Sequence, residues 1–189
     1  MKWISKERLM DSIADALTAL VDRSHSVHKK EARLPRIRNR KFDGIRCPSI
    51  TVRDYYYRIA ALCSCSCSCH LLALIYMDRL QQSVHNLFFD VLNIHRIVIT
   101  SIMCAAKFYD DTFLSNAYYA MVGGISLREM NRLEVRFLSM INFRLTVLPE
   151  HFGAYLSRLG CMGPQRLHTY TKAHERPGEE TTTAATELS

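Results

Sequence analysis

Ten successive residues without a charged side chain, 97–106, end at Lys107 and constrain this chain more than any other feature. Apolar residues on nearly every side of such a run predict a helix at the centre of a fold. A lysine that enters a buried helix loses its hydration, which is costly unless a carboxylate answers the charge. Glu134, in the amphipathic segment 130–138, is the best candidate for that carboxylate. The two residues are therefore expected to form either a structural ion pair or a docking point for another protein.

Hydrophobic periodicity elsewhere predicts only helices, because no stretch sustains the alternation of apolar and polar residues that a half-buried strand shows. Residues 69–81 and 94–109 are apolar on most sides and are expected to be central. The other segments are amphipathic and are expected to wrap around these two. The expected helices are 6–22, 51–62, 69–81, 94–109, 116–121, 126–141 and 150–159, so the predicted fold class is all-α.

Several of these helices carry sequence signals at their ends. Ser126 and Glu129 form an S-x-x-E capping box, the best-marked helix start in the chain. Thr51 precedes Asp54 in a variant of the same arrangement. Further expected signals are Asn93 and the serines between residues 63 and 69 as caps, and Gly123 and Gly124 as helix ends.

The positive charge is concentrated in one stretch. The 189 residues carry a formal net charge of +7, with 25 basic and 18 acidic residues. Residues 28–46 hold eight of the basic residues against two acidic ones, which leaves 17 against 16, or +1, for the rest. The globular part is therefore not a basic, nucleic-acid-binding type of domain. The basic stretch is interpreted as a solvated or partly packed loop, with nuclear import through residues 29–41 or nucleic-acid contact as alternatives.

The seven cysteines are expected to be reduced thiols, because they lack the spacing of a disulfide framework and no secretory segment accompanies them. Four of them, Cys63, Cys65, Cys67 and Cys69, precede His70 and could in principle bind a soft metal. The C-x-C spacing is poor for structural zinc, where C-x2-C is usual. The four cysteines are therefore interpreted as small side chains that are buried or half-buried. Neither a metal nor a cofactor is expected.

Catalysis and membrane insertion are both disfavoured by the sequence. The eight histidines show no metal-ligand spacing, and the chain contains no phosphate-binding glycine loop or nucleophile elbow. No stretch approaches the roughly 20 apolar residues that cross a bilayer. A non-catalytic protein without a small-molecule substrate or membrane partner is expected, located inside the cell in the nucleus, the cytoplasm or both.

Four motifs follow one another along the chain: Y-M-D-R-L at 76–80, N-I-H-R at 93–96, A-A-K-F-Y-D-D at 105–111 and N-A-Y-Y-A-M-V-G-G-I-S at 116–126. Together they resemble the cyclin box of the P-type cyclins. This group is called U-type in plants and includes the yeast phosphate-response cyclins. The resemblance implies a single five-helix cyclin box at 49–160. It would be flanked by an amphipathic N-terminal helix at 1–27, a basic linker at 28–48, a short C-terminal helix, and a tail at 161–189 that we expect to be disordered.

The resemblance also implies a function, namely a subunit that binds and activates a cyclin-dependent protein kinase and directs it to substrates. The family's central contact with the kinase matches Lys107 and Glu134. The further matches on the kinase-facing surface are Cys104, Phe108, Leu138, Phe143 and Leu145, with Phe143 as the aromatic anchor. Arg58 and Asp78 match a structural ion pair. The alternative is a cyclin-fold adaptor that binds nucleic acid or another protein without activating a kinase, although nucleic acid is disfavoured by the nearly neutral globular part.

Overall fold

The computed structural model describes residues 5–30, 42–84 and 87–161. Most of the basic stretch (31–41) and the tail (162–189) lie outside these residues, so the predictions of nuclear import and of a disordered tail remain predictions. Within the described residues there is no strand. The all-α prediction is therefore confirmed.

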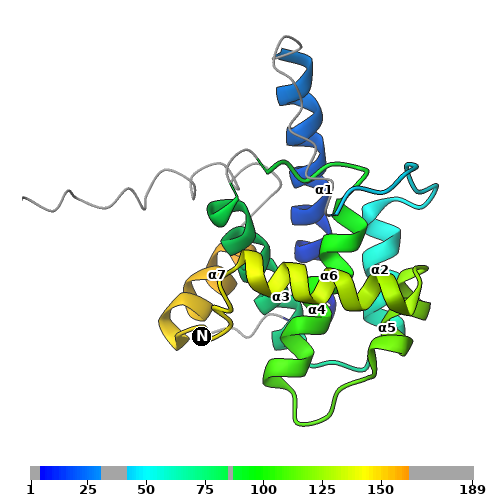
Figure 1. Ribbon diagram of the computed structural model, residues 1–189. Coiled ribbons are helices and arrows are strands. Elements are labelled where there is room, and N and C mark those ends of the chain that lie inside the picture. Colours follow the sequence, from blue (N-terminus) through cyan, green and yellow to red (C-terminus); the bar gives the residue numbers. More distant parts are fainter. Residues whose placement is uncertain (1–4, 31–41, 85–86, 162–189) are drawn as a thin grey trace, which may run out of the picture.

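The described part of the chain contains seven helices, and α3 and α4 form its centre. Helix α4 runs through the middle of the molecule and α6 crosses it, while α7 and α5 lie on opposite sides (Figure 1). Helices α3 and α4 pack against each other, as their apolar sequences predict. The helices are α1 (Lys6–Lys30), α2 (Val52–Leu62), α3 (Cys67–Ser83), α4 (Ile94–Tyr109), α5 (Asn116–Gly123), α6 (Leu127–Met140) and α7 (Pro149–Cys161).

Helix α4 is the most enclosed element, with 12 of its 16 residues buried. Its two buried hydroxyl groups both donate to carbonyl oxygens within the helix, so neither hydroxyl is left unsatisfied in the core. Thr100 donates to the carbonyl oxygen of Arg96 at 2.6 Å, and Ser101 donates to that of Val98 at 3.0 Å. The charge of Lys107 therefore enters the fold only in the last turn of α4.

Two of the expected caps form. The amide of Asp54 donates to the Thr51 hydroxyl at 3.1 Å, and the amide of Glu129 donates to the Ser126 hydroxyl at 3.1 Å. The Glu129 carboxylate does not complete the capping box, since it accepts a 2.7 Å hydrogen bond from Arg96 on α4. The tertiary contact thus replaces the local one. Gly124, with a φ of 67°, ends α5 in the left-handed conformation as predicted.

Two other expected caps, Asn93 and Ser66, stand at the N-cap positions of α4 and α3, but neither side chain makes the capping hydrogen bond. The Asn93 side chain binds the preceding loop, accepting from the Asp90 amide and donating to the Phe88 carbonyl oxygen, both at 3.0 Å. The serine before α3 is Ser66, whose hydroxyl donates to Cys69 Sγ at 3.3 Å and makes no cap. Helix α3 consequently begins at Cys67, two residues before its predicted start.

Helix α1 continues to Lys30, beyond the predicted end at residue 22, because no glycine or proline interrupts residues 22–30. It packs against α2 through an ion pair between Asp15 and Arg53 and a hydrogen bond from the Tyr57 hydroxyl to Asp11. The start of the basic linker at residue 28 is therefore helical. Near the linker's other end, Phe42 is fully buried and its ring packs edge-on to that of Phe137, 6.3 Å away.

The cysteines between residues 63 and 69 are buried or half-buried, as predicted. Cys63 and Cys69 are buried, and Cys65 and Cys67 are half-buried. Burial raises the pKa of Cys63 to about 11 and that of Cys65 and Cys69 to about 12, which favours unreactive thiols. Across residues 5–30, 42–84 and 87–161, no three His, Cys, Asp or Glu side chains are placed to hold a metal ion. Nor does this part of the chain contain a helix with the length and hydrophobicity needed to traverse a bilayer.

Candidate protein-binding site

Lys107 and Glu134 form the ion pair that the sequence predicts. Lys107 Nζ contacts Glu134 Oε1 between the last turn of α4 and the middle of α6. The two side chains are 30% and 16% exposed, so the pair lies at the edge of the core. A pair in this position is neither a freely solvated surface contact nor a fully desolvated one.

Asn116, the first residue of α5, completes the polar cluster. Its Oδ1 accepts a hydrogen bond from Lys107 Nζ at 3.1 Å, and its Nδ2 donates to Glu134 Oε2 at 2.7 Å. Three helices are thus joined at one point. A lysine ammonium has three donors, and these contacts use two of them. The remaining donor of Lys107 can serve a group outside this cluster.

The predicted apolar residues around the pair differ in exposure. Phe143 and Phe108 are 67% and 49% exposed, and Leu138 and Leu145 are half-buried. Large aromatic side chains that remain this exposed contribute little to the core of the isolated chain. They are available to contact a second protein.

Cys104 does not belong to the exposed part of this surface. It is only 3% exposed, and burial raises the pKa of its thiol, with a further rise from the nearby Glu134 carboxylate. Its side chain lies among the core residues of α4. This burial favours a packing role for Cys104, and its contact with a kinase remains a prediction.

A reversal of the chain after α6 projects Phe143 outward. Asn142 and Phe143 have φ angles of 54° and 53°, and the Phe143 amide donates to the Leu138 carbonyl oxygen at 2.8 Å. Asparagine tolerates this left-handed conformation, but for a bulky residue it is a true outlier. It costs roughly 1 kcal/mol or more at Phe143, so the surrounding structure must hold it in place.

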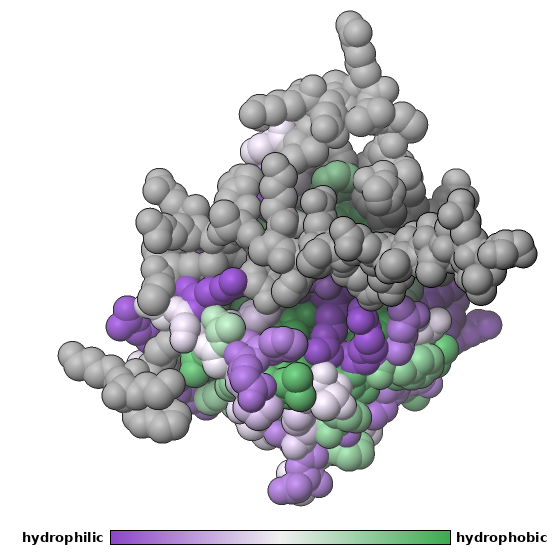
Figure 2. Space-filling view, turned by 90° about the vertical axis from the view of Figure 1, so that its left-hand side faces the viewer, coloured by the Kyte–Doolittle hydropathy of each residue, from purple (hydrophilic) through white to green (hydrophobic). Residues whose placement is uncertain are grey.

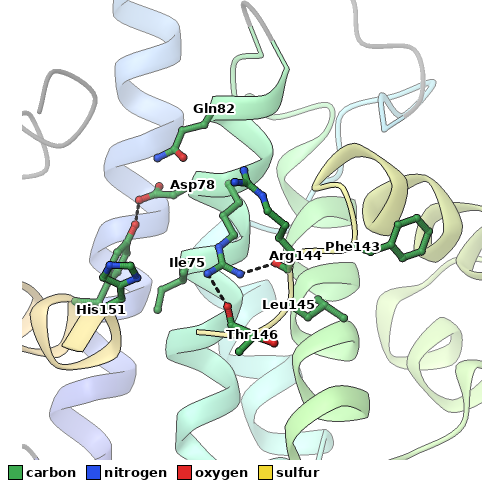
Figure 3. Close-up of a pocket in the computed structure, with 10 residues that line it drawn as sticks. Ile75, Asp78, Gln82, Phe143, Arg144, Leu145, Thr146 and His151 are labelled. Carbon is green, nitrogen blue, oxygen red and sulfur yellow. Dashed lines mark hydrogen bonds between the residues drawn. The ribbon is translucent and has the colours of Figure 1, made fainter. Parts of the chain in front are cut away.

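Side chains of α3 and α4 hold this reversal. Arg79 donates to the carbonyl oxygens of Arg144 and Thr146, the latter at 2.9 Å (Figure 3). The hydroxyl of Tyr76 donates to the Leu145 carbonyl oxygen at 2.8 Å. Tyr109 of α4 accepts from the Val147 amide at 2.7 Å. We call residues 142–147 the clamped segment, because contacts to its main chain fix its path.

Replacing Arg79 by lysine should loosen the clamped segment. A guanidinium binds two carbonyl oxygens in a fixed fork, whereas an ammonium group is a compact point charge. Loss of one charge-assisted hydrogen bond should lower the free energy of unfolding by about 2 kcal/mol, measured by urea denaturation. Arg132→Lys on the exposed face of α6 is the matched control and should change stability by less than about 0.5 kcal/mol. Equal stabilities for Arg79→Lys and the wild type would show that the fork is unimportant.

The structure does not form the predicted pair between Arg58 and Asp78. Arg58 is exposed on α2. Asp78 accepts a hydrogen bond from Tyr155 on α7, and the charge of Arg158 acts on it from the same helix. Burial raises the pKa of the Asp78 carboxyl, and these two contacts partly offset that rise. Asp78 therefore links α3 to α7 instead of to α2.

The sequence missed several residues that shape the site. Asn116 and Arg79 stand inside recognisable motifs, but nothing in their local spacing shows that they contact residues 18 and 65 positions away. Tyr76 and Tyr109 likewise fit the apolar periodicity of their helices and gave no separate signal. Their hydroxyl partners are main-chain groups of the clamped segment, which no side-chain pattern specifies.

The chain is similar to known proteins over most of this region. The protein-family model described as Cyclin matches residues 7–145. Cyclin-U4-1 of Arabidopsis thaliana is 44% identical over 118 residues, which are 62% of this chain and 58% of that protein. Cyclin-P3-1 of Oryza sativa subsp. japonica is 46% identical over 118 residues, which are 62% of this chain and 50% of the relative.

The similarity extends to a fungal protein. The PHO85 cyclin-like protein psl1 of Schizosaccharomyces pombe is 38% identical over 115 residues, which are 60% of this chain and 47% of the relative. The aligned region thus spans about half the length of these three relatives. All four predicted motifs, 76–80, 93–96, 105–111 and 116–126, lie within the residues that the family model matches.

Proposed function

We propose that this chain, which belongs to the cyclin family and within it to the U-type and P-type cyclins, binds and activates a cyclin-dependent protein kinase. A cyclin has a regulatory role. The kinase would supply the bound nucleotide, the metal ion and the catalytic groups, and this chain would supply none of them. Its contribution would be a binding surface that favours the active arrangement of the kinase.

The cluster of Lys107, Glu134 and Asn116 at the edge of the core carries this proposal. Its charged groups are held by each other but are not sealed from solvent. A helix of the kinase that docks here would offer main-chain and side-chain polar groups to the cluster. The exposed Phe108 and Phe143 rings would exclude water around those contacts and supply most of the binding energy.

Activation would follow from differential affinity. A kinase whose regulatory helix moves between two positions responds only to a partner that binds one position more tightly. The clamped segment and the three-helix cluster give this chain a fixed surface, so it would select the position that fits. Unequal binding of the two positions then shifts the kinase towards the active one.

Affinity purification of the tagged 189-residue chain from cell extract should recover a cyclin-dependent kinase with activity above that of the kinase alone. Arg58→Ala, on an exposed position of α2, is the control and should recover the kinase equally well. Failure of the wild type to recover any protein kinase would contradict the proposal. Salt-dependent affinity for DNA without kinase recovery would instead favour the adaptor alternative.

A further inference from the structure

A pocket of about 420 Å³ lies between α3, α7 and the clamped segment. Phe143 is one of its lining residues, but the ring points away from the other side chains drawn (Figure 3). A kinase on the Phe143 ring and a ligand in the pocket would therefore contact different sides of the same segment. Phe143 and Leu145, both predicted to face a kinase, line the pocket, but its polar side chains take no part in the contacts proposed above.

The charge of the pocket lining is mainly positive. Arg79 and Arg144 line it against one carboxylate, Asp78. The Asp78 carboxylate is already engaged by the Tyr155 hydroxyl and by the charge of Arg158. The balance favours a ligand group that carries negative charge.

Hydrogen-bond donors are placed to receive such a group. Arg144, His151 and Gln82 line the pocket and are exposed, and each carries at least one N–H donor. A guanidinium binds carboxylate or phosphate oxygens in a bidentate fork. The donors come from α3, the clamped segment and α7, so the pocket offers donors to an anion from three elements.

The rest of the pocket fits a short peptide better than a large apolar partner. Ile75, Leu145 and Tyr155 provide apolar wall for the stem of a bound side chain. Where the described residues are visible on the side of the molecule that carries α7, hydrophilic side chains lie between the hydrophobic ones (Figure 2). This visible part of the surface lacks the continuous apolar patch that a stable subunit interface requires.

We propose that this pocket binds an anionic side chain, carboxylate or phosphate, on a peptide segment of a protein that the kinase complex phosphorylates. The pocket itself follows from its charge and shape, and assigning the peptide to a kinase substrate rests on the proposed function. The site would hold a substrate beside the kinase and raise its local concentration there. It would thereby contribute to substrate choice without touching the catalytic groups.

The test uses three capped pentapeptides, Leu-Ala-X-Ala-Leu, in which X is glutamate, phosphoserine or glutamine. Binding to the 189-residue chain is followed by the NMR signals of the His151 ring and of backbone amides. The glutamate or the phosphoserine peptide should bind at least about tenfold more tightly than the glutamine peptide. Arg144→Ala should remove about that tenfold preference, whereas Arg132→Ala on α6 should retain it. Tighter binding of phosphoserine than of glutamate would identify a phosphorylated occupant, and the reverse would identify a carboxylate.

Equal binding of all three peptides, or binding that survives both Arg144→Ala and His151→Ala, would overturn the proposal. The outcomes also separate it from the proposed function. Kinase recovery without preferential binding of either anionic peptide would refute the pocket alone. Anion-selective peptide binding without kinase recovery would confirm the pocket and refute its link to kinase substrates.

Discussion

Exchanging the charges of the central pair, Lys107→Glu with Glu134→Lys, should preserve folding and weaken kinase binding at least about a hundredfold. Each single variant places two like charges side by side and should lower the free energy of unfolding by about 2 kcal/mol, or the Tm by roughly 6 °C. The double variant restores an opposite-charge pair. Asn116 also donates to Asn131 Oδ1, at 2.9 Å. The two side-chain amides can rotate together, so that Asn116 donates to the new carboxylate and accepts from the new ammonium group and from Asn131. The stability of the double variant should therefore lie within about 0.5 kcal/mol of the wild type.

Kinase affinity should not recover in the double variant. Groups of the partner helix that accept from Lys107 in the wild type would face a carboxylate. Groups that donate to Glu134 would face an ammonium group. Mispaired charges in a desolvated contact should weaken binding at least a hundredfold, about 2.7 kcal/mol or more. Titration calorimetry with the purified kinase measures this loss. The matched control is the exposed pair between α1 and α2, exchanged as Asp15→Arg with Arg53→Asp, which should leave affinity unchanged. Kinase affinity equal to the wild type in the Lys107 and Glu134 exchange would show that this pair is only structural.

The fold was predictable where the signal was local. Thr51 and Ser126 cap their helices because the accepting hydroxyl and the donating amide lie three residues apart. The same rule failed for Asn93, whose side chain satisfies main-chain groups of the loop before it. At the Ser126 capping box only the serine half formed, because the Glu129 carboxylate accepts a hydrogen bond from Arg96 of α4 instead. Local rules cannot rank a local partner against one that folding brings from elsewhere.

The central pair was predictable because of its energetic cost. A lysine at the end of an apolar helix requires a carboxylate, and only an amphipathic helix such as α6 could bring one to the core. Asp78 carried no comparable requirement, since a solvated or capped position would have satisfied it equally well. Its real partner, Tyr155, lies on α7, 77 residues away. A sequence pattern shows that a buried charged group needs a partner more reliably than it shows which residue that partner is.

The surface around the pair depends on backbone geometry that no sequence signal announces. A left-handed conformation at two successive residues normally indicates glycine, yet Asn142 and Phe143 occupy these positions. The conformation persists because Arg79, Tyr76 and Tyr109 bind the main chain that follows. Those contacts therefore offset the conformational cost of the left-handed backbone that projects the exposed Phe143 ring. That arrangement favours a role for Phe143 in binding over a role in folding.

Substitution of Phe143 should separate these two roles. Glycine adopts a φ of 53° without the steric cost that any other residue carries, whereas alanine keeps that cost. Because the Phe143 ring is 67% exposed, its removal sacrifices little buried area. Phe143→Gly should therefore be about 1 kcal/mol more stable than Phe143→Ala and at least as stable as the wild type. Urea denaturation of the three proteins measures this order.

Both Phe143 variants should lose kinase affinity to the same extent, by about 30-fold to 100-fold, because both lack the aromatic anchor. The control is Ile45→Ala, a fully exposed apolar residue near the N-terminal end of α4, the end opposite to Lys107. This control should leave affinity unchanged. A glycine variant that gains stability and loses kinase binding would show that the left-handed conformation serves the interface. Retention of full kinase affinity by both variants would show that Phe143 is not part of the binding surface. A glycine variant less stable than the alanine variant would show that the backbone at residue 143 is not strained.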